Sequence, residues 1–390
     1  MKIAILTSGV MPVPAVQGGA VENLIDFYLE YNQLHHIHDI TIYSIWHPDV
    51  KNHPALDSVV NHYQYVKVDT LWAKLKKAIY RRSHRNDYYH YSIEYYFEQV
   101  FCRLRNQDFD AIIIENRPGY ILKLKEKINT PCILHLHNDF LNKDSRQASD
   151  IFSGFEGIVS ISDFITNRVQ EINSKQLKCK TVHNAIDCQR FHQAKPILRE
   201  NYGLSDKDFV IVYSGRLTQE KGILQLIQAI KKMQDIPHLK LLIIGASSYG
   251  IDKHPSSFIR QLEEESESIR NQVIFTGYIT YEHVPSYLKM ADIAVVPSMW
   301  EEPFGLTIVE SMAAGLPLIT TRSGGIPEIC EGVAMIVERD NIVNNLAAAI
   351  LDLYQHPEKR QQMAAASLVR SKLFDKETYA RNFFATLENL

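Results

Sequence analysis

The chain of 390 residues has few cysteines, little excess charge and no long apolar run. Its five cysteines show no spacing typical of a metal or redox site, which favours a reduced, cytoplasmic protein. The net charge of −3 argues against nucleic acid as the main partner. No uncharged apolar run reaches the roughly 18 residues that a membrane-spanning helix needs, and the apolar run at residues 2–6 is too short for a signal peptide. The function must therefore be sought in the motifs of a globular chain.

Short apolar runs alternate with helical patterns along the whole chain, which predicts α/β domains with parallel sheets and crossover helices. The length exceeds what a single core normally supports, so we expect two doubly wound domains. The first covers residues 1–184 and the second 209–375, with a linker at 185–208 that has no apolar period. The expected strands are 2–7, 40–45, 111–114, 132–136, 157–161, 180–183, 209–213, 240–244, 273–275, 293–296, 318–320 and 334–337.

The most informative segment is WEEPFGLTIVE at 300–310, which spans an expected strand-to-helix turn. It contains two carboxylates, Glu302 and Glu310, that lie at most about 12 Å apart along a helix axis. The unpaired amides at a helix start, together with the helix dipole, attract a phosphate or hydroxyl oxygen. Here those amides belong to Phe304, Gly305 and Leu306. The arrangement suits the two ends of one extended ligand such as a nucleotide sugar.

This segment resembles the donor-site motif of retaining glycosyltransferases of family 4, in the GT-B superfamily, which includes bacterial lipopolysaccharide, capsule and phosphatidylinositol mannosyl transferases. The resemblance implies that Glu302 faces the donor sugar and that Glu310 holds the ribose hydroxyls. It also implies two Rossmann-like domains facing each other across a cleft, with a helix at 376–390 crossing back to the first domain. The alternative is a pair of solvated glutamates near a helix start.

Two cations follow the first expected strand of the second domain, Arg216 and Lys221, around a glycine turn. Fixed cations aimed at a diphosphate stabilise the charge that develops as it leaves. The string resembles the phosphate clamp of the same family, which takes the place of a metal ion, although two solvated cations are the alternative. The sequence Asp-Phe-Asp at 108–110 leads into an expected strand and is interpreted as a turn. We therefore expect no metal and no cofactor besides the donor.

In the first domain, Gly18 and Gly19 follow the first strand, where paired glycines let backbone approach a diphosphate or an acceptor. The pair is not the G-x-G-x-x-G pattern and is compatible with a plain turn, but its position resembles the family's flexible glycine loop. His135 and His137 point to one face of an expected strand end. The resemblance implies that His137 lies near the donor sugar, with His135 as second choice. A metal site from the pair lacks an evident third ligand.

The loop containing Gly277 and Tyr278 follows another strand and resembles the family's nucleotide-binding loops. In that family the base is read largely by backbone near this glycine. Such contacts leave little trace in the side chains, so the donor is expected to be either UDP- or GDP-linked.

The stretch 72–105 is basic in its first part and rich in tyrosine in its second. Its basic part could lie on an anionic membrane. A solvated helix followed by a packed tyrosine-rich helix is the alternative.

These features predict a retaining, metal-independent hexosyltransferase of the EC 2.4 kind, which moves a sugar from a nucleoside diphosphate to the hydroxyl of a glycan or lipid-linked acceptor. On family grounds the product is expected to be a bacterial polysaccharide or glycolipid, made in the cytoplasm, either free of the membrane or peripherally at its inner face. Two alternatives remain open: a nucleotide-sugar epimerase or hydrolase on the same scaffold, and a catalytically silent sugar-binding partner.

Overall fold

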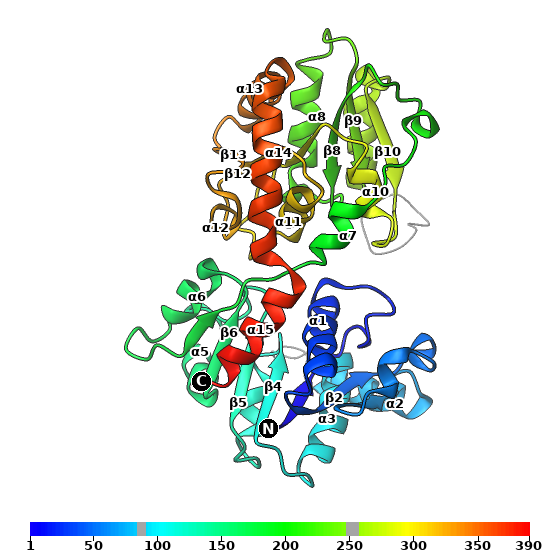
Figure 1. The fold of residues 1–390 in the computed structure, drawn as a ribbon. Coiled ribbons are helices and arrows are strands. Elements are labelled where there is room, and N and C mark those ends of the chain that lie inside the picture. The colour runs from blue at the N-terminus through cyan, green and yellow to red at the C-terminus, as the bar shows by residue number, and fades with distance from the viewer. Residues whose placement is uncertain (84–90, 247–256) are drawn as a thin grey trace. The chain divides into compact units, whose positions relative to one another are not determined.

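The computed structural model describes residues 1–83, 91–246 and 257–390, which form two compact units (Figure 1). Unit 1 comprises Met1–Asn184 and Lys376–Leu390, and unit 2 comprises Ala185–Asp375. Each unit is a parallel β-sheet with crossover helices, so the expected doubly wound architecture is confirmed.

Unit 1 has a seven-stranded sheet in the order β3-β2-β1-β4-β5-β6-β7. Its strands are β1 (Lys2–Leu6), β2 (Asp39–Ile45), β3 (Asn61–Val66), β4 (Ala111–Glu115), β5 (Cys132–Leu136), β6 (Gly157–Ser160) and β7 (Cys179–Thr181). Its α-helices are α1 (Ala20–His35), α2 (Leu71–Ser83), α3 (Tyr91–Leu104), α4 (Tyr120–Leu124), α5 (Ala148–Gly154), α6 (Asp163–Gln170) and α15 (Lys376–Leu387).

Unit 2 has a six-stranded sheet in the order β10-β9-β8-β11-β12-β13. Its strands are β8 (Phe209–Ser214), β9 (Leu239–Ile244), β10 (Val273–Gly277), β11 (Ile293–Val296), β12 (Leu318–Thr321) and β13 (Met335–Val337). Its α-helices are α7 (Cys188–Gln193), α8 (Ile223–Lys231), α9 (Ser257–Ser266), α10 (Val284–Leu288), α11 (Leu306–Ala313), α12 (Ile326–Cys330), α13 (Ile342–Gln355) and α14 (Pro357–Ser371).

The strand order reverses between β1 and β4 in unit 1 and between β8 and β11 in unit 2. In open parallel sheets, ligands bind beyond the carboxyl ends of the strands at this point. The loops after these four strands are therefore where chemistry is expected.

Apolar side chains at helical spacing attach each crossover helix to its sheet. In α8 they are Ile223, Leu226, Ile227 and Ile230, all fully buried. Burial of such a side chain contributes about 1.5–3 kcal/mol to folding. The helix therefore holds the loop that precedes it against the carboxyl edge of β8.

All twelve expected strands are present, but one strand was missed. β3 is one of the two edge strands of its sheet, and the exposed polar residues His62 and Gln64 alternate with half-buried tyrosines along it. Because one side of an edge strand faces solvent, its apolar signal is weak. The expected linker at 185–208 also differs, since it contains α7 and a 3-10 turn, Arg199–Tyr202, and lies within unit 2.

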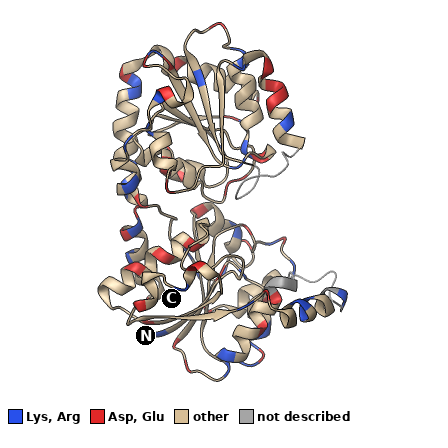
Figure 2. Cartoon of the chain, turned by 90° about the vertical axis from the view of Figure 1, so that its right-hand side faces the viewer, with Lys and Arg blue, Asp and Glu red and all other residues tan. Residues whose placement is uncertain are grey.

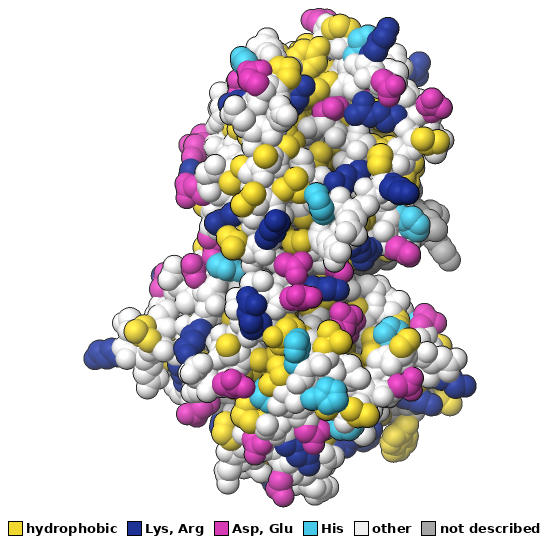
Figure 3. Space-filling view, in the orientation of Figure 1, with side chains coloured by type: hydrophobic (Ala, Val, Ile, Leu, Met, Phe, Trp, Pro, Cys, Tyr) yellow, Lys and Arg dark blue, Asp and Glu magenta, His cyan; other side chains and the backbone are white. Residues whose placement is uncertain are grey.

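Charged side chains of both signs are interspersed on the face shown in Figure 3. None of the helices within the described residues combines the length and the apolar character needed to cross a bilayer.

Candidate active site

The loops after β8 and β11 bring together three of the predicted donor-site residues. Arg216 and Lys221 lie in the first loop and Glu302 in the second. Because β8 and β11 are neighbours in the sheet, both loops lie at the same carboxyl edge. Residues separated by about 80 positions in the sequence thus share one site.

Backbone contacts hold these two loops against each other. The amide of Met299 donates to the carbonyl of Glu220 at 2.8 Å. At Gly222, φ is 72° and a Cβ atom would lie 1.8 Å from the carbonyl oxygen of Pro297. A side chain would force the loops apart, so only glycine fits here.

Glu302 is nearly buried, with 6% of its surface exposed, and forms an ion pair with Lys221. Its Oε1 atom also accepts a hydrogen bond from Ser298 Oγ at 3.0 Å. The Lys221 ammonium lies 5.2 Å from the centre of the Trp300 ring, a cation–π distance. Lys221 was predicted to bind phosphate and Glu302 to face the sugar, and in the structure the two groups also form an ion pair with each other.

The Arg216 side chain is exposed, while its backbone is anchored because Tyr213 Oη donates to the Arg216 carbonyl at 2.8 Å. Burial acts to raise the pKa of Glu220. A backbone amide, Thr218 and the charges of Arg216 and Lys221 together outweigh burial and hold that pKa below its usual value. The charges of Arg216 and Lys221 therefore both act on the loop around Glu220.

Helix α11 begins at this edge after Gly305, whose φ of 117° favours glycine. Within the described residues, no side chain caps the helix start. The ring of Phe304 is buried and makes an edge contact with Phe374 at 5.8 Å. Phe304 thus anchors the turn, and the amides of Gly305 and Leu306 lie in the first turn of the helix, where intrahelical partners are lacking.

Glu310 lies on α11 and is 6% exposed. Burial raises its pKa to about 7, although a hydrogen bond from Tyr281 and the charge of Arg190 oppose the rise. The Arg190 guanidinium lies 5.1 Å from the centre of the Tyr281 ring and donates to the Tyr281 carbonyl at 2.9 Å. Arg190 and Tyr281 therefore accompany the predicted ribose-binding carboxylate.

Gly277 ends β10, and its carbonyl accepts from the amide of Gly245 at 3.1 Å. A Cβ atom on Gly245 would lie 1.9 Å from the carbonyl oxygen of Gly215, which requires glycine there as well. The neighbouring Tyr278 side chain is 41% exposed. The ends of β8, β9 and β10 are thus in close backbone contact, next to an accessible aromatic ring.

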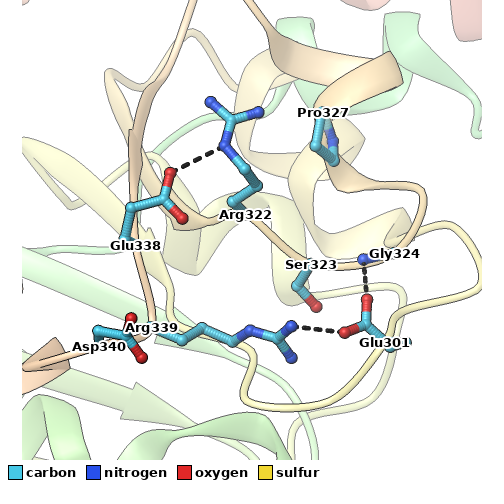
Figure 4. A pocket seen from close by; sticks show the side chains of 8 residues that line it. All are labelled: Glu301, Arg322, Ser323, Gly324, Pro327, Glu338, Arg339 and Asp340. Atoms are coloured by element: carbon cyan, nitrogen blue, oxygen red, sulfur yellow. Dashed lines mark hydrogen bonds and ion pairs between the residues drawn. The ribbon is translucent and has the colours of Figure 1, made fainter.

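A polar pocket of about 400 Å³ adjoins this region (Figure 4). It reaches the Glu302 turn through Gly324 and Gly325, and the Gly325 amide donates to the Glu302 carbonyl at 2.8 Å. Its two guanidinium groups already face carboxylates, Arg339 with Glu301 and Arg322 with Glu338. The residues around the pocket therefore hold the Glu302 turn in place. Its lining residues are Glu301, Arg322, Ser323, Gly324, Pro327, Glu338, Arg339 and Asp340.

In unit 1, the glycine loop leads into α1. Gly18 and Gly19 have φ values of 75° and 106°. A Cβ atom on Gly19 would lie 2.3 Å from a carboxylate oxygen of Glu22, whereas nothing lies within 4 Å of one on Gly18. Burial raises the pKa of Glu22, which accepts a hydrogen bond from Ser8 Oγ at 3.2 Å. The loop thus carries a nearly buried carboxyl beside the end of β1.

His135 and His137 share one partner that the sequence analysis did not find, Glu115, the last residue of β4. Glu115 Oε2 lies 2.7 Å from His137 Nε2 and 3.1 Å from His135 Nδ1. Tyr28 Oη donates to Glu115 Oε1 at 2.8 Å. All four side chains are almost fully buried. Glu115 supplies a third group that could join the two imidazoles in holding a metal ion, which the sequence did not show.

Burial acts to raise the pKa of Glu115, but the His135 charge and hydrogen bonds from both imidazoles outweigh it and hold the pKa at about 2. Burial lowers the pKa of His137 to about 4; the charge of His135 acts in the same direction, and Glu115 opposes it. At neutral pH Glu115 is therefore ionised and His137 is neutral.

The basic part of the stretch 72–105 forms α2, which contains lysines and arginines and no acidic residue (Figure 2). Tyr96 in α3 is buried, and its hydroxyl donates to the carbonyl of Tyr43, as expected for a packed tyrosine-rich helix. Arg85, Tyr88 and Tyr89, which belong to the same prediction, lie outside the described residues.

Comparison with known proteins identifies the class. Residues 194–368 match the model of the family Glycosyl transferases group 1. Spore coat protein SA of Bacillus subtilis (strain 168) is 28% identical over 94% of this chain and 93% of its own length. The lipopolysaccharide 1,2-N-acetylglucosaminetransferase of Salmonella typhimurium is 25% identical over 82% of both chains.

Among solved structures, Anabaena Alr3699/HepE in complex with UDP and glucose matches with a TM-score of 0.75 and 19% identity, covering all of both chains. This likeness shows that the fold is that of the GT-B glycosyltransferases. The family match over residues 194–368 and the transferase among the relatives identify the chain as a glycosyltransferase. More narrowly, the region that carries Arg216, Lys221, Glu302 and Glu310 is of the group 1 kind.

Four neighbours of the predicted site residues were not predicted from the sequence: Glu115, Tyr28, Arg190 and Tyr281. The end of β4 offered a signal for Glu115, since a carboxylate that closes an all-apolar buried strand faces the sheet edge. Arg190 gave no signal, because it lies in the segment taken as a linker.

Proposed function

We propose that the protein is a retaining, metal-independent transferase that moves a sugar from a UDP- or GDP-linked donor to an acceptor hydroxyl. The observation that carries the proposal is the group of Arg216, Lys221 and Glu302 at the edge where β8 and β11 meet. The group combines two cations suited to a diphosphate with one carboxylate suited to a sugar. Metal ions are not needed, because the basic side chains balance the diphosphate charge.

The Lys221–Glu302 ion pair prepares both groups for a donor. A diphosphate beside Arg216 competes with Glu302 for the Lys221 ammonium, since each offers negatively charged oxygens. As the bond to the sugar breaks, negative charge grows on the diphosphate and positive charge on the anomeric carbon. Lys221 then stabilises the first and Glu302 the second, so the pair acts more strongly in the transition state than on the bound donor.

The chemical step follows from this distribution of charge. The acceptor hydroxyl oxygen bonds to the anomeric carbon on the face from which the diphosphate departs, so the configuration is retained. The hydroxyl proton passes to the departing phosphate oxygen, and the nucleoside diphosphate leaves with the electron pair of the broken bond. No separate protein base is required for this step.

Other residues bind the two ends of the donor. In this proposal Glu310 accepts hydrogen bonds from the ribose hydroxyls, and backbone near Gly277 and Tyr278 reads the base. Amides of Phe304, Gly305 and Leu306 and the loop at Gly18 and Gly19 contact the phosphates or the acceptor, and His137 supports the sugar. The UDP and glucose bound by the Anabaena protein favour a nucleotide-sugar donor.

The test is transfer from UDP-glucose or GDP-mannose to a soluble glycan or lipid-linked acceptor, with the product anomer read by NMR. The expected product keeps the donor's configuration, forms in the presence of EDTA and disappears in Arg216→Ala. A product formed from donor alone would instead reveal an epimerase or hydrolase. No transfer by a folded chain to any acceptor tried, with nucleotide binding intact, would favour a silent sugar-binding partner.

The acceptor is proposed to belong to a bacterial polysaccharide or glycolipid, since the Salmonella relative is a lipopolysaccharide transferase. A lipid-linked acceptor would place the reaction at the cytoplasmic face of a membrane. Helix α2 provides a surface for that contact: one side is exposed and apolar, with Leu71, Trp72, Leu75 and Ile79 each at least 51% exposed. Lys74 and Lys76 are also exposed and flank this apolar side.

An apolar face bordered by lysines is typical of helices that lie in the interface of an anionic membrane. Replacing Trp72, Leu75 and Ile79 together by serine is expected to abolish sedimentation with vesicles containing phosphatidylglycerol. The matched control is Leu177→Ser, which changes one leucine that is 81% exposed elsewhere in unit 1. Undiminished sedimentation of the triple variant would exclude α2 as the membrane contact.

A further inference from the structure

Glu115 is a buried anion at the carboxyl end of β4, and three side chains of unit 1 converge on it. Its two oxygens are approached by Tyr28 Oη, His135 Nδ1 and His137 Nε2 at 2.8, 3.1 and 2.7 Å. A carboxylate only accepts hydrogen bonds, so each nitrogen that faces it must carry a hydrogen. Glu115 therefore decides which nitrogen of each imidazole is protonated.

We propose that Glu115 is a positioning residue that keeps His137 in the tautomer with hydrogen on Nε2 and leaves Nδ1 as an acceptor for a hydroxyl group of the sugar substrate. The inference rests on the function proposed above and deepens it by naming the group that His137 offers to the sugar.

The two histidines differ in what surrounds their second nitrogen. The His135 ring lies within β5, 4.8 Å from the Phe383 ring and 6.4 Å from the Tyr379 ring, so α15 covers it. His137 lies one residue beyond the end of β5, at the carboxyl edge where ligands bind. Its backbone amide donates to Asn116 Oδ1 at 3.1 Å, which fixes its position.

Nδ1 of His137 is buried and has no hydrogen-bond partner within the described residues. A buried acceptor that lacks a hydrogen bond destabilises the folded state. A substrate hydroxyl that donates to Nδ1 would remove this cost, so the structure contains a reason for the site to bind one. Protonation at Nδ1 would reverse the interaction and turn the acceptor into a donor.

Helix α15 stabilises the arrangement from the other side. Phe383 stacks on the Tyr28 ring at 4.5 Å, with 13° between the planes. This contact orients the Tyr28 hydroxyl towards Glu115. Helix α15 thus takes part in fixing the tautomer of His137 through Tyr28 and Glu115.

A metal ion held by the two imidazoles and Glu115 is the rival explanation. The nitrogen–oxygen distances of 2.7 and 3.1 Å are hydrogen-bond lengths. Histidines that bind a metal usually donate their other N–H to an acceptor, and within the described residues neither His135 Nε2 nor His137 Nδ1 has a partner. The hydrogen-bonded anion is therefore the better account.

The experiment uses the full chain labelled with ¹⁵N at histidine, with His137 assigned by comparison with His137→Gln. At pH 7 the wild type is expected to show hydrogen on Nε2 and none on Nδ1. Addition of UDP-glucose or GDP-mannose, whichever binds, should shift the Nδ1 resonance. Hydrogen on Nδ1 in the wild type, or no shift on binding, would overturn the proposal even if Glu115→Gln failed to fold.

Glu115→Gln tests the positioning role, because an amide must present its NH₂ group to one neighbour. We expect a change in the His137 tautomer and a fall in kcat of about 10- to 100-fold. This is the range for residues that orient a functional imidazole through a hydrogen bond. KM for the donor should stay within about twofold, because uniform binding is not removed. Glu94→Gln, which changes another buried carboxylate of unit 1, is the control and should leave the tautomer unchanged.

Other outcomes separate the two proposals. An unchanged tautomer in folded Glu115→Gln refutes the positioning role, and stoichiometric zinc in the purified wild type refutes the hydrogen-bonded anion. Loss of transfer in Arg216→Ala with an intact His137 tautomer is expected if both proposals hold. A wild type that has the expected tautomer and Nδ1 shift but transfers no sugar would contradict the proposed reaction and leave the positioning role of Glu115 intact.

Discussion

The two units place a carboxylate at equivalent positions and treat it differently. β4 in unit 1 and β11 in unit 2 each pair with the first strand of their sheet, and Glu115 and Glu302 lie at or after their carboxyl ends. Glu302 pairs with a cation, Lys221, whose side chain is 21% exposed. Glu115 is sealed at 0% exposure between Tyr28 and two imidazoles.

Glu302 can therefore exchange its charged partner during a reaction, whereas Glu115 keeps the same hydrogen-bond partners. A cation near solvent can move from a carboxylate to a phosphate as a substrate arrives, so Glu302 can change partners during a reaction. A carboxylate held by fixed side chains cannot change partners without leaving a buried polar group unsatisfied. Unit 2 is therefore built for charge that changes during a reaction, and unit 1 for geometry that does not.

The largest effect is expected when the exchangeable pair is broken. Lys221→Met should lower kcat by about 10²- to 10³-fold, because it removes a donor aimed at the developing charge and leaves Glu302 without its counter-charge. Steady-state kinetics with the preferred nucleotide sugar will measure it. Lys231→Met, which breaks a more exposed pair with Glu265, is the control. A Lys221→Met enzyme within threefold of the wild type would show that the pair is not part of the machinery.

The glycine loops of the two units give the next contrast. Gly222→Ala should destabilise unit 2 by about 3 kcal/mol or more, for two reasons. The new Cβ atom would clash with the carbonyl oxygen of Pro297, and the alanine would have to adopt an unfavourable positive φ. Gly18→Ala has a similar φ and open space, so only the backbone term of about 1–2 kcal/mol remains. Denaturant unfolding followed by hydrogen exchange in each unit will compare them. Equal losses would contradict the close approach at Gly222.

Glu310 in unit 2 and His137 in unit 1 should make contributions to stability that respond to pH in opposite directions. The pKa of Glu310 is raised to about 7, so the folded state holds this proton more tightly than the unfolded one, and its contribution is lost as pH rises from about 4.5 to 7. The pKa of His137 is lowered to about 4, so the unfolded state takes up that proton first, and stability is lost as pH falls from about 6.5 to 4. Each effect amounts to at most about 3 kcal/mol.

Unfolding free energies at several pH values will test this, with Glu310→Gln and His137→Gln as references. The difference between wild type and Glu310→Gln should shrink or change sign towards pH 7, and that between wild type and His137→Gln towards pH 4. Parallel curves for wild type and Glu310→Gln would mean that the carboxyl stays ionised in the folded state.

Features formed by one continuous segment could be predicted from the sequence, whereas contacts between distant segments could not. The strands of the two sheets and the turn at 300–310 are continuous segments with strong apolar or glycine signals, so they were predictable. β3 was not, because the exposed polar residues His62 and Gln64 interrupt its apolar signal. Pairings such as Glu115 with His137 and Tyr281 with Glu310 depend on strand order and helix packing, which spacing in the sequence does not encode.

The smallest effects come from removing one neutral donor from each carboxylate. Tyr28→Phe deletes a hydroxyl bonded to a sealed anion, and hydrogen bonds to charged groups contribute about 1.5–3 kcal/mol, so unit 1 should lose about 2 kcal/mol. Ser298→Ala deletes the corresponding donor to Glu302, but Lys221 still neutralises that carboxylate, so unit 2 should lose about 1 kcal/mol. Hydrogen exchange resolved by peptide will report each unit separately. A larger loss for Ser298→Ala would mean that Glu302, and not Glu115, depends more on its neutral donor, which would reverse the distinction drawn between the two carboxylates.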